Sequence, residues 1–342
     1  MTKPILSVVI DTYNHERYIE QAVVSAIEQD FPSSEYEVLV VDDGSTDRSP
    51  EIVRKFEPRV RLFRKKNGGQ ASAFNVGIRE SHGEIVSFLD GDDWWAREKL
   101  IAVTTALLER PEAAALGHGF YEFNDDTRET KLCSPGKGKL VDLSTPEAAR
   151  EAYLGWLFLL TSALTVRKKM LDRIVPLPDA LAFCADTPIA MASMAWGVYL
   201  LPQPLCFYRQ HQNNLQSVDP TDVIRMQRKA EMNETIFEFT ESLLLGLGVR
   251  EDSVMALMYP HWIQQSRSNL RAFGGPRLRA YRTEIRSLRV EYTNPTMRYR
   301  LFKYLVVGGA TLLLPPHQFY KFRDWYGRHN LGQVREQFAR IR

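Results

Sequence analysis

Short apolar runs alternate with segments of helical periodicity over the first hundred residues, and this alternation constrains the fold more than any other feature. Runs of strand length fall at 5–10, 36–41, 60–64 and 84–89. Helical spacing lies between them, at 18–29, 47–56 and 72–80. Strands that are apolar on both faces need cover on both sides, which is typical of parallel sheets. The sequence therefore predicts an α/β fold whose mostly parallel central sheet is flanked by helices.

Polar residues follow three of these strands at the point where each one ends. The clusters are, in chain order, Asp11-Thr12-Tyr13-Asn14, Asp42-Asp43-Gly44-Ser45 and Asp90-Gly91-Asp92-Asp93. Ligands of parallel sheets bind at the carboxyl ends of the strands, so we expect all three clusters to meet at one edge. A helix cap explains one such cluster equally well, but three at one edge favour a ligand site.

The third cluster, at 90–93, places three carboxylates within four residues. Like charges this close repel and raise each other's pKa, and a divalent cation relieves the repulsion. Mg²⁺ and Mn²⁺ prefer clustered carboxylates together with phosphate oxygens. The cluster therefore predicts a metal–diphosphate site with Mg²⁺ or Mn²⁺ as the cofactor.

The charge is unevenly distributed along the 342 residues, although the net charge is only +2. Residues 267–342 hold 16 Lys and Arg against 4 Asp and Glu, a net charge of +12, and the first 266 residues carry −10. Three separate cysteines give no disulfide framework, which indicates a reducing compartment. No secretory signal and no apolar stretch long enough to span a bilayer is evident, so we expect a cytoplasmic protein.

Five short segments occur along the first half of the chain. They are Ser7-Val8-Val9-Ile10-Asp11-Thr12-Tyr13-Asn14, Val41-Asp42-Asp43-Gly44-Ser45-Thr46-Asp47, Asn67-Gly68-Gly69-Gln70-Ala71, Asn75-Val76-Gly77 and Leu89-Asp90-Gly91-Asp92-Asp93. This series resembles the family 2 glycosyltransferases, closely over residues 5–100 and more loosely to 215. The resemblance implies a GT-A (Rossmann-like) fold and inverting transfer from a nucleotide-diphosphate sugar with Mg²⁺ or Mn²⁺. It implies a catalytic domain at 1–215, made of a nucleotide-sugar half at 1–110 and an acceptor half at 111–215. A helical, basic C-terminal region then occupies 216–342.

The resemblance, together with the chemistry of the residues, assigns the donor and metal sites. The expected nucleotide-sugar-binding residues are Asp11, Tyr13, Glu16, Asp43, Gly69, Gln70, Asn75, Asp90, Gly91 and Arg209. The expected metal ligands are Asp92, Asp90 and His211, with Asp92 the direct one. Arg209 and His211 resemble an Arg-x-His pair of the family, and Arg is suited to bidentate contact with phosphate. The family usually has proline where Asp11 stands, so this carboxylate is a departure.

Asp186 is the expected general base, because the family places a Glu-Asp pair here whose Asp has that role. Ala185 replaces the Glu, which removes a neighbouring carboxylate but leaves the base. Apolar neighbours such as Phe183 and Ile189 favour a raised pKa for Asp186. The alternative for Asp186 is a simple helix N-cap.

Trp94 and Trp95 follow the acidic cluster directly. Aromatic faces stack well on sugars, so both are expected to bind the acceptor, and a position in the protein core is an equal alternative.

The basic tail is most prominent over residues 276–325, where arginines at helical spacing, an eleven-residue apolar stretch and several aromatic residues follow one another. This pattern favours peripheral contact with an anionic membrane on its inner, cytoplasmic face. Packing on the catalytic domain or on a second subunit, in a homodimer, is an equal alternative. Nucleic acid is not an expected partner, because no recognised nucleic-acid-binding module accompanies the charge.

The sequence as a whole predicts an inverting, metal-dependent glycosyltransferase. Its substrates would be a nucleotide-diphosphate sugar, most simply a UDP-sugar, and a hydroxyl of a glycan or lipid-linked glycan, as in polysaccharide or cell-surface glycan synthesis. One alternative is a nucleotidyltransferase, which needs a Gly-rich basic loop where Asp11-Thr12-Tyr13-Asn14 stands. The other is a non-catalytic sugar-nucleotide-binding protein, an alternative that Ala185 and Asp11 leave open.

Overall fold

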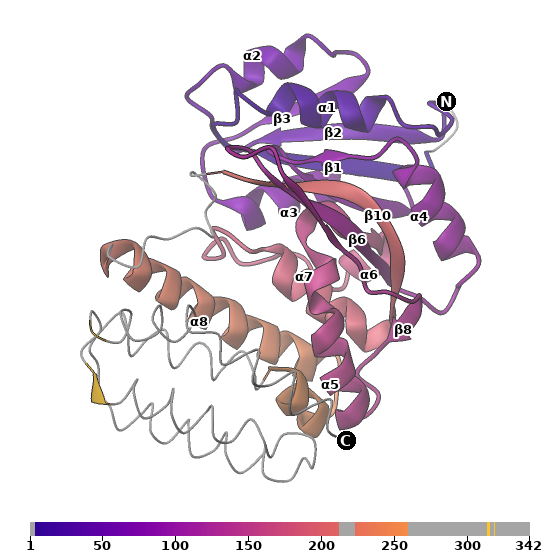
Figure 1. Ribbon diagram of the computed structural model, residues 1–342, viewed down its shortest axis with the longest axis vertical. Coiled ribbons are helices and arrows are strands. Elements are labelled where there is room, and N and C mark those ends of the chain that lie inside the picture. Colours follow the sequence, from indigo (N-terminus) through magenta and orange to yellow (C-terminus); the bar gives the residue numbers. More distant parts are fainter. Residues whose placement is uncertain (1–3, 212–222, 259–312, 315–317, 319–342) are drawn as a thin grey trace. The chain divides into compact units, whose positions relative to one another are not determined.

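The computed structural model describes residues 4–211, 223–258, 313–314 and 318 (Figure 1). The chain divides into two compact units, the first formed by Met1–Leu215 with Thr235–Met258 and the second by Gln216–Glu234 with Tyr259–Arg342. The sheet and the candidate site both lie in the first unit. The expected basic segment 276–325 lies almost entirely outside the described residues, so its contacts stay predictions, as do the expected domain boundaries.

Ten strands form one sheet in the described part of the chain. Their order is β3-β2-β1-β4-β9-β6-β10-β5, with β7 paired to β6 and β8 paired to β10. The first four strands are β1 (Leu6–Thr12), β2 (Tyr36–Asp42), β3 (Val60–Arg64) and β4 (Ile85–Asp90). All their mutual pairings are parallel, which confirms the expected α/β fold around a mostly parallel set of strands.

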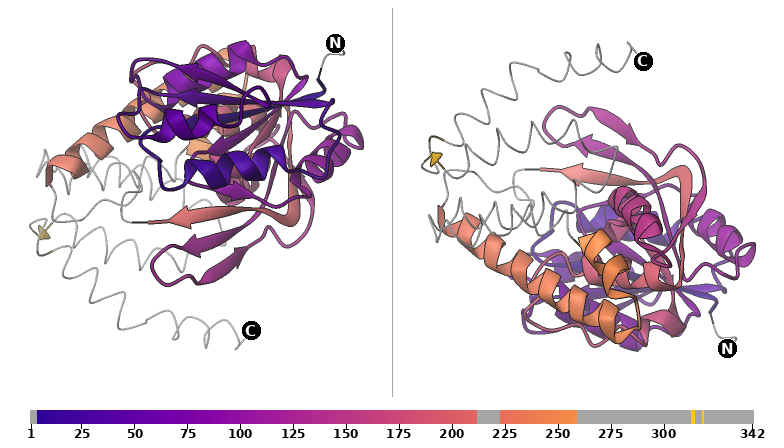
Figure 2. Two further views of the ribbon diagram at one scale, coloured as in Figure 1. Left: turned by 90° about the horizontal axis from the view of Figure 1, so that it is seen from above. Right: turned by 90° about the horizontal axis from the view of Figure 1, so that it is seen from below.

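The other half of the sheet is mixed in direction. Its strands are β5 (Trp94–Trp95), β6 (Ala115–Asn124), β7 (Thr130–Cys133), β8 (Lys139–Val141), β9 (Thr165–Arg167) and β10 (Val198–Gln210). Strand β9 runs antiparallel to both β4 and β6, whereas β10 runs parallel to β6 and antiparallel to β5. Strands β6 and β10 extend side by side over most of their length (Figure 2).

Helices α1 (Ile19–Ile27), α2 (Ser49–Arg54) and α3 (Gln70–Glu80) cover the two faces of the parallel strands. The described residues also form α4 (Lys99–Leu108), α5 (Pro146–Gly155), α6 (Lys168–Leu171), α7 (Asp186–Ser193) and α8 (Val223–Gly246), with short 3₁₀ turns η1 (Trp156–Leu159), η2 (Thr161–Ala163) and η3 (Met194–Trp196). Helices α1 and α2 lie on one side of β1 and β2, and α3 lies on the other (Figure 1). No helix among these residues combines the length and the apolar character that a membrane crossing requires.

The alternation of side chains along β1 explains this two-sided cover. Val8 and Ile10 are fully buried in a core cluster that includes Ile19 of α1. Val9 points to the other face, where a Cβ on Gly77 of α3 would lie only 2.3 Å from its Cγ1 atom. Glycine is therefore needed at position 77 for α3 to approach the sheet this closely.

Strand β9 covers only Thr165–Arg167, because the residues before it form the 3₁₀ turn η2, to which Ser162 belongs. The carbonyl of Ser162 accepts hydrogen bonds from Trp95 Nε1 at 2.9 Å and from Lys99 Nζ at 2.6 Å. These buried donors occupy an oxygen that would otherwise join a ladder, so side-chain contacts override the local β pattern.

Candidate active site

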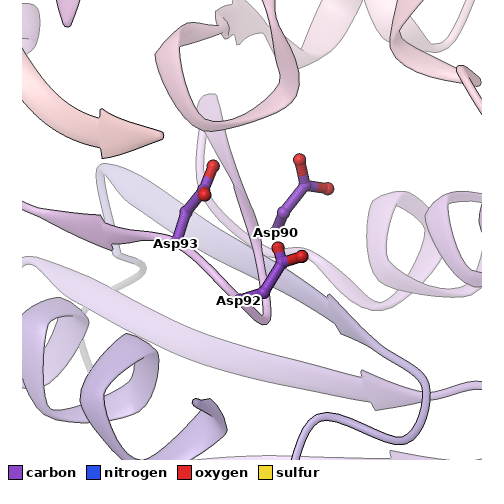
Figure 3. Close-up of side chains that lie close together, drawn as sticks. All are labelled: Asp90, Asp92 and Asp93. Carbon is purple, nitrogen blue, oxygen red and sulfur yellow. The ribbon is translucent and has the colours of Figure 1, made fainter. Parts of the chain in front are cut away.

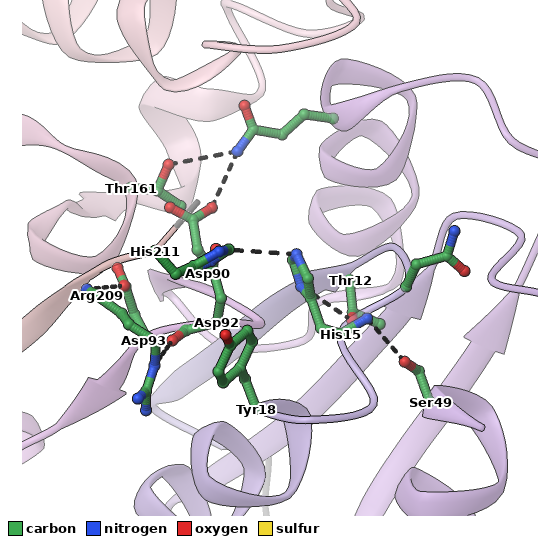
Figure 4. A network of polar contacts seen from close by, with 12 residues as sticks. Thr12, His15, Tyr18, Ser49, Asp90, Asp92, Asp93, Thr161, Arg209 and His211 are labelled. Carbon is green, nitrogen blue, oxygen red and sulfur yellow. Dashed lines mark hydrogen bonds and ion pairs between the residues drawn. The ribbon is translucent and has the colours of Figure 1, made fainter. Parts of the chain in front are cut away.

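The ends of the parallel strands bring the polar clusters together, as predicted. In the β1–β4 ladder Asp11 pairs with Asp90, and in the β1–β2 ladder Thr12 pairs with Asp42. The register therefore places the residues that follow each strand at one edge of the sheet. Figure 4 shows the network of polar contacts that results.

The acidic turn after β4 forms the centre of this edge (Figure 3). Asp90, Asp92 and Asp93 each offer a carboxylate oxygen, and these oxygens lie within 4.8 Å of one another. Asp93 is 1% exposed, and it accepts hydrogen bonds from Ser162 Oγ at 2.5 Å and from the backbone N–H of Arg209 at 2.8 Å. Asp93 thus anchors the turn, and Asp90 and Asp92 are the two carboxylates best placed to meet a ligand.

The carboxylates at this edge repel one another electrostatically. Burial, then the charges of Asp11, Asp93 and Asp92, raises the pKa of Asp90 well above its usual value. Burial also raises the pKa of Asp11 to about 7, with the charge of Asp92 adding to the effect. Within the described residues, Oδ1 of Asp11 is buried without a hydrogen-bond partner. Such crowding of buried carboxylates is what a bound cation relieves.

Two histidines lie near Asp92, His15 in the loop between β1 and α1 and His211 directly after β10. Nε2 of His211 lies 3.0 Å from Oδ2 of Asp92, and Nε2 of His15 lies 3.9 Å from the same oxygen. Burial alone would raise the pKa of Asp92, but His15 and His211 outweigh it and the pKa is lowered. His15 was not predicted, although it directly follows the first polar cluster. The donor set of Asp90, Asp92 and His211 fits a divalent cation that prefers oxygen with some nitrogen.

The side chain of Arg209 is held by a ring of partners. Its Nε donates to the carbonyl of Asp92 at 2.8 Å, Nη1 to Asp125 at 2.8 Å and Nη2 to Gln21 at 2.6 Å. The guanidinium also lies over the rings of Tyr18 and Trp94, 4.7 and 4.5 Å from their centroids. Arg209 therefore clamps the acidic turn to β10, and its contact with a diphosphate stays a prediction.

Asp43, after β2, organises the loop that leads into α3. It accepts hydrogen bonds from the backbone N–H groups of Gly68 at 3.0 Å and Gly69 at 2.7 Å, and it pairs with Lys65. Gly69 has φ +84°, and a Cβ there would lie 2.4 Å from Cα of Ala182. The loop therefore requires glycine at 69, and the roles of Asp43 and Gly69 in donor binding stay predictions.

Helix α3 carries two amides that reach the segment before α7. Asn75 exchanges two hydrogen bonds, both 2.8 Å, with the backbone N–H and carbonyl of Leu177. Gln70 donates to Oδ1 of Asp90 at 3.0 Å and accepts from the N–H of Ala185 at 2.9 Å. Both residues were expected to bind the donor. In the structure Asn75 pins a loop, and Gln70 links the acidic turn to the region of the predicted base.

Asp186 is the first residue of α7 and faces η2. Its Oδ2 accepts the backbone N–H of Thr161 at 3.0 Å and the Thr161 hydroxyl at 3.2 Å. Burial raises the pKa of Asp186, and these hydrogen bonds from Thr161 oppose the rise. A carboxyl group with a raised pKa is better suited to accept a proton near neutral pH.

Three further expected donor-site residues lie around β1. Tyr13 is 45% exposed, so its ring is accessible to a ligand. Glu16 pairs with Arg48 at 3.1 Å. Gly91 is tightly packed, since a Cβ there would lie 2.9 Å from both the carbonyl of Asp11 and Nδ1 of His15. Their roles in binding stay predictions.

The two tryptophans occupy different surroundings. Trp94 stacks on Phe207, with ring centroids 4.7 Å apart and planes within 4°. Trp95 is 3% exposed, and Lys99 Nζ lies 3.9 Å from its ring centroid. Trp95 is thus packed in the core, which was the alternative considered for it, and the acceptor role of Trp94 stays a prediction.

The sheet topology and this acidic edge fit the glycosyltransferase class that the sequence predicts. The model for glycosyl transferase family 2 matches residues 7–175, which contain the acidic turn. The chain belongs to this family, and it is a glycosyltransferase.

Curated relatives and solved structures agree with this assignment. An uncharacterized glycosyltransferase of Nostoc sp., alr2836, is 28% identical over 282 residues, which are 79% of this chain and 86% of the relative. The poly(ribitol-phosphate) beta-N-acetylglucosaminyltransferase TarS of Staphylococcus aureus is 41% identical over 98 residues, 28% of this chain and 17% of TarS. The crystal structure of TarS residues 1–349 in complex with UDP-GlcNAc has a TM-score of 0.53 and 23% identity, covering 82% of this chain and 83% of that chain. This structural likeness confirms the GT-A fold.

Proposed function

We propose that this glycosyltransferase moves a sugar, with inversion, from a UDP-sugar to a hydroxyl of a glycan or lipid-linked glycan. The observation that carries the proposal is the connection between Asp90 and the turn at Asp186 through a single side chain, Gln70. This connection supports neighbouring sites for the leaving diphosphate and for a base. Glycosyl transfer requires both.

A divalent cation, Mg²⁺ or Mn²⁺, fits the residues at the acidic edge. Asp92, Asp90 and His211 would hold it, with the crowded charges of Asp11 and Asp90 favouring its binding. When bound, such an ion neutralises the charge that develops on a departing diphosphate.

Asp186 would remove the proton from the acceptor hydroxyl. The hydroxyl oxygen then forms its bond to the anomeric carbon as the bond from that carbon to the diphosphate oxygen breaks. Attack from the face opposite the leaving group inverts the anomeric configuration. The products are the new glycoside and a nucleoside diphosphate, and the proton stays on Asp186 until it passes to water.

The choice of a UDP-sugar rests on two observations. The TarS structure with the same fold contains UDP-GlcNAc. Asp43 also stands at the end of β2, where a carboxylate can accept the N3–H of a uracil ring. Tyr13 and Glu16, which follow β1, and Gly69, which precedes α3, complete the proposed donor site together with Asn75 of α3.

We also propose that the protein is cytoplasmic and that its basic tail contacts an anionic membrane. The tail's net charge of +12 over residues 267–342 supports contact with an anionic membrane surface that carries a lipid-linked acceptor. Binding of the full chain to vesicles with and without anionic lipid tests this, and equal binding to both would contradict it.

The test of the reaction is product analysis with a panel of UDP-, GDP- and dTDP-sugars. We expect release of UDP from a UDP-sugar, loss of release in EDTA, and recovery when Mn²⁺ or Mg²⁺ is restored. Release of pyrophosphate would instead indicate a nucleotidyltransferase. Donor binding without any release, with or without candidate acceptors, would indicate a non-catalytic sugar-nucleotide-binding protein.

A further inference from the structure

Thr161 makes two hydrogen bonds to one oxygen of Asp186. Its backbone N–H lies 3.0 Å from Oδ2 and its hydroxyl oxygen lies 3.2 Å from the same atom. Thr161 is 2% exposed, so water competes poorly for these bonds. Two donors on one oxygen fix the rotation of the carboxylate, and neither of them uses Oδ1.

Thr161 is itself held by the residue that follows it. The Ser162 hydroxyl donates to Asp93 at 2.5 Å and accepts the N–H of Asp90 at 3.2 Å. The Ser162 carbonyl accepts from Trp95 and Lys99, both in the core. The 3₁₀ turn η2 is therefore fixed to the acidic turn, and Thr161 has little freedom to move away from Asp186.

Gln70 completes the support around the Thr161 hydroxyl. Its Nε2 lies 3.0 Å from Oδ1 of Asp90 and 3.5 Å from Oγ1 of Thr161. The Thr161 hydroxyl therefore accepts from Gln70 while it donates to Asp186. The hydroxyl proton of Thr161 therefore points toward Asp186, because Asp186 accepts from the hydroxyl and Gln70 donates to it.

We propose that Thr161 is the positioning residue for the Asp186 carboxylate. The hydroxyl of Thr161 orients this carboxylate and stabilises its ionised form. This inference rests on the proposed function, in which Asp186 is the base. Thr161 acts through Asp186 and has no role of its own in donor binding. The charge of Asp186 raises the pKa of Asp11 and of Asp90, so these two carboxylates in turn disfavour the ionisation of Asp186.

The test compares Thr161→Val, which keeps the branched shape and removes the hydroxyl, with Thr161→Ser, which keeps the hydroxyl. A hydrogen bond to a charged group contributes enough that its loss lowers kcat about tenfold to hundredfold. We expect that loss for Thr161→Val, with the KM and Kd for the UDP-sugar unchanged. Thr161→Ser should retain most of the wild-type kcat.

The pH dependence of kcat gives a second readout. Without the hydroxyl, the ionised form of Asp186 is less stable and its pKa rises, so the acidic limb moves to higher pH by about one unit. Thr161→Ser should leave the limb where it is. If Thr161→Val fails to fold, Thr161→Ala removes the same hydroxyl without adding a methyl group beside a carboxylate.

Three results would overturn the inference. They are a wild-type kcat and pH profile without the hydroxyl, a loss of donor affinity as large as the loss of rate, and a serine variant as impaired as the valine variant. The variant Asp186→Asn separates the inference from the proposal on which it rests. Full activity of Asp186→Asn would refute the base itself, whereas an inactive Asp186→Asn beside a fully active Thr161→Val refutes only the role of Thr161.

Discussion

Nε2 of His211 lies 3.0 Å from Oδ2 of Asp92, although 119 residues separate the two in the chain. The antiparallel pairing of β5 with β10 brings them together, since Trp94 pairs with Phe207 in that ladder. The acidic turn immediately precedes β5, and His211 immediately follows β10. The mixed half of the sheet thus supplies a nitrogen to a site whose oxygens come from the parallel half.

Replacing His211 should weaken metal binding. We expect His211→Ala to raise the Kd for Mn²⁺ at least about tenfold, because it removes a ligand or its closest support. His15→Ala is the matched control: His15 approaches the same oxygen only to 3.9 Å, so its loss should have a smaller effect. Titration of Mn²⁺ by electron paramagnetic resonance measures both. Equal Kd values for wild type and His211→Ala would contradict the assignment.

The sequence was sufficient to predict the edge at which the site forms. Parallel strands end together, so Asp11 and Asp90 had to meet once the strands were recognised. It was not sufficient for contacts made by segments far apart in the chain. The clamp of Arg209 by Gln21 and Asp125, and the pairing of Asn75 with the backbone of Leu177, depend on tertiary packing that no local pattern encodes.

Arg209 should contribute to stability in addition to any contact with substrate. Its side chain is 5% exposed and pairs with Asp125, which is 12% exposed. Removing Arg209 leaves Asp125 with weaker partners, the hydroxyl of Tyr18 at 3.2 Å and the exposed Arg128 at 3.2 Å, so the loss should fall below the about 3–5 kcal/mol of a buried charge left without compensation. We expect Arg209→Leu to lower the free energy of unfolding by about 1–3 kcal/mol. Arg209→Lys should lower it less, because lysine keeps the charge beside Asp125 although it cannot form the fork of contacts.

Urea unfolding measures the loss, and Arg17→Lys is the control. Arg17 also approaches Asp125, but at 3.9 Å and with a side chain that is 73% exposed. Exposed pairs of this kind contribute under about 1 kcal/mol. Equal stability of Arg209→Leu and wild type would show that the clamp has no structural role, and any change in donor affinity would then report a direct contact with the diphosphate.

Asp186→Asn should abolish transfer and leave donor binding intact. Asparagine keeps the size of the side chain and its capacity to accept from Thr161, but it cannot take a proton from the acceptor. We expect kcat to fall by about 10²- to 10⁴-fold, with the Kd for the UDP-sugar within twofold of wild type. Rate measurements check the fall in kcat, and calorimetry checks the Kd for the UDP-sugar. A parallel loss of rate and donor affinity would place Asp186 in the donor site instead.

We expect Lys99 to give the folded chain a pH-dependent stability that is independent of catalysis. Its side chain is fully buried, with Nζ 2.6 Å from the carbonyl of Ser162. Burial lowers the pKa of Lys99 from 10.5 to about 7, although Cys206 and Asp93 favour the charged form. Between pH 7 and pH 10.5 the unfolded chain therefore binds a proton that the folded chain has released. The free energy of unfolding rises with pH across this interval as a consequence.

Lys99→Met removes this titration while it keeps a long, unbranched side chain in the same space. The difference in unfolding free energy, wild type minus variant, should be constant below pH 6 and should then rise between pH 7 and pH 10. The slope is at most about 1.4 kcal/mol per pH unit, which corresponds to one proton. Urea titrations at pH 6, 8 and 9.5 measure it. Tyrosines and cysteines titrate in both proteins, so their contributions to the unfolding free energy cancel in the difference. A constant difference across this range would mean that Lys99 is protonated in the folded state throughout.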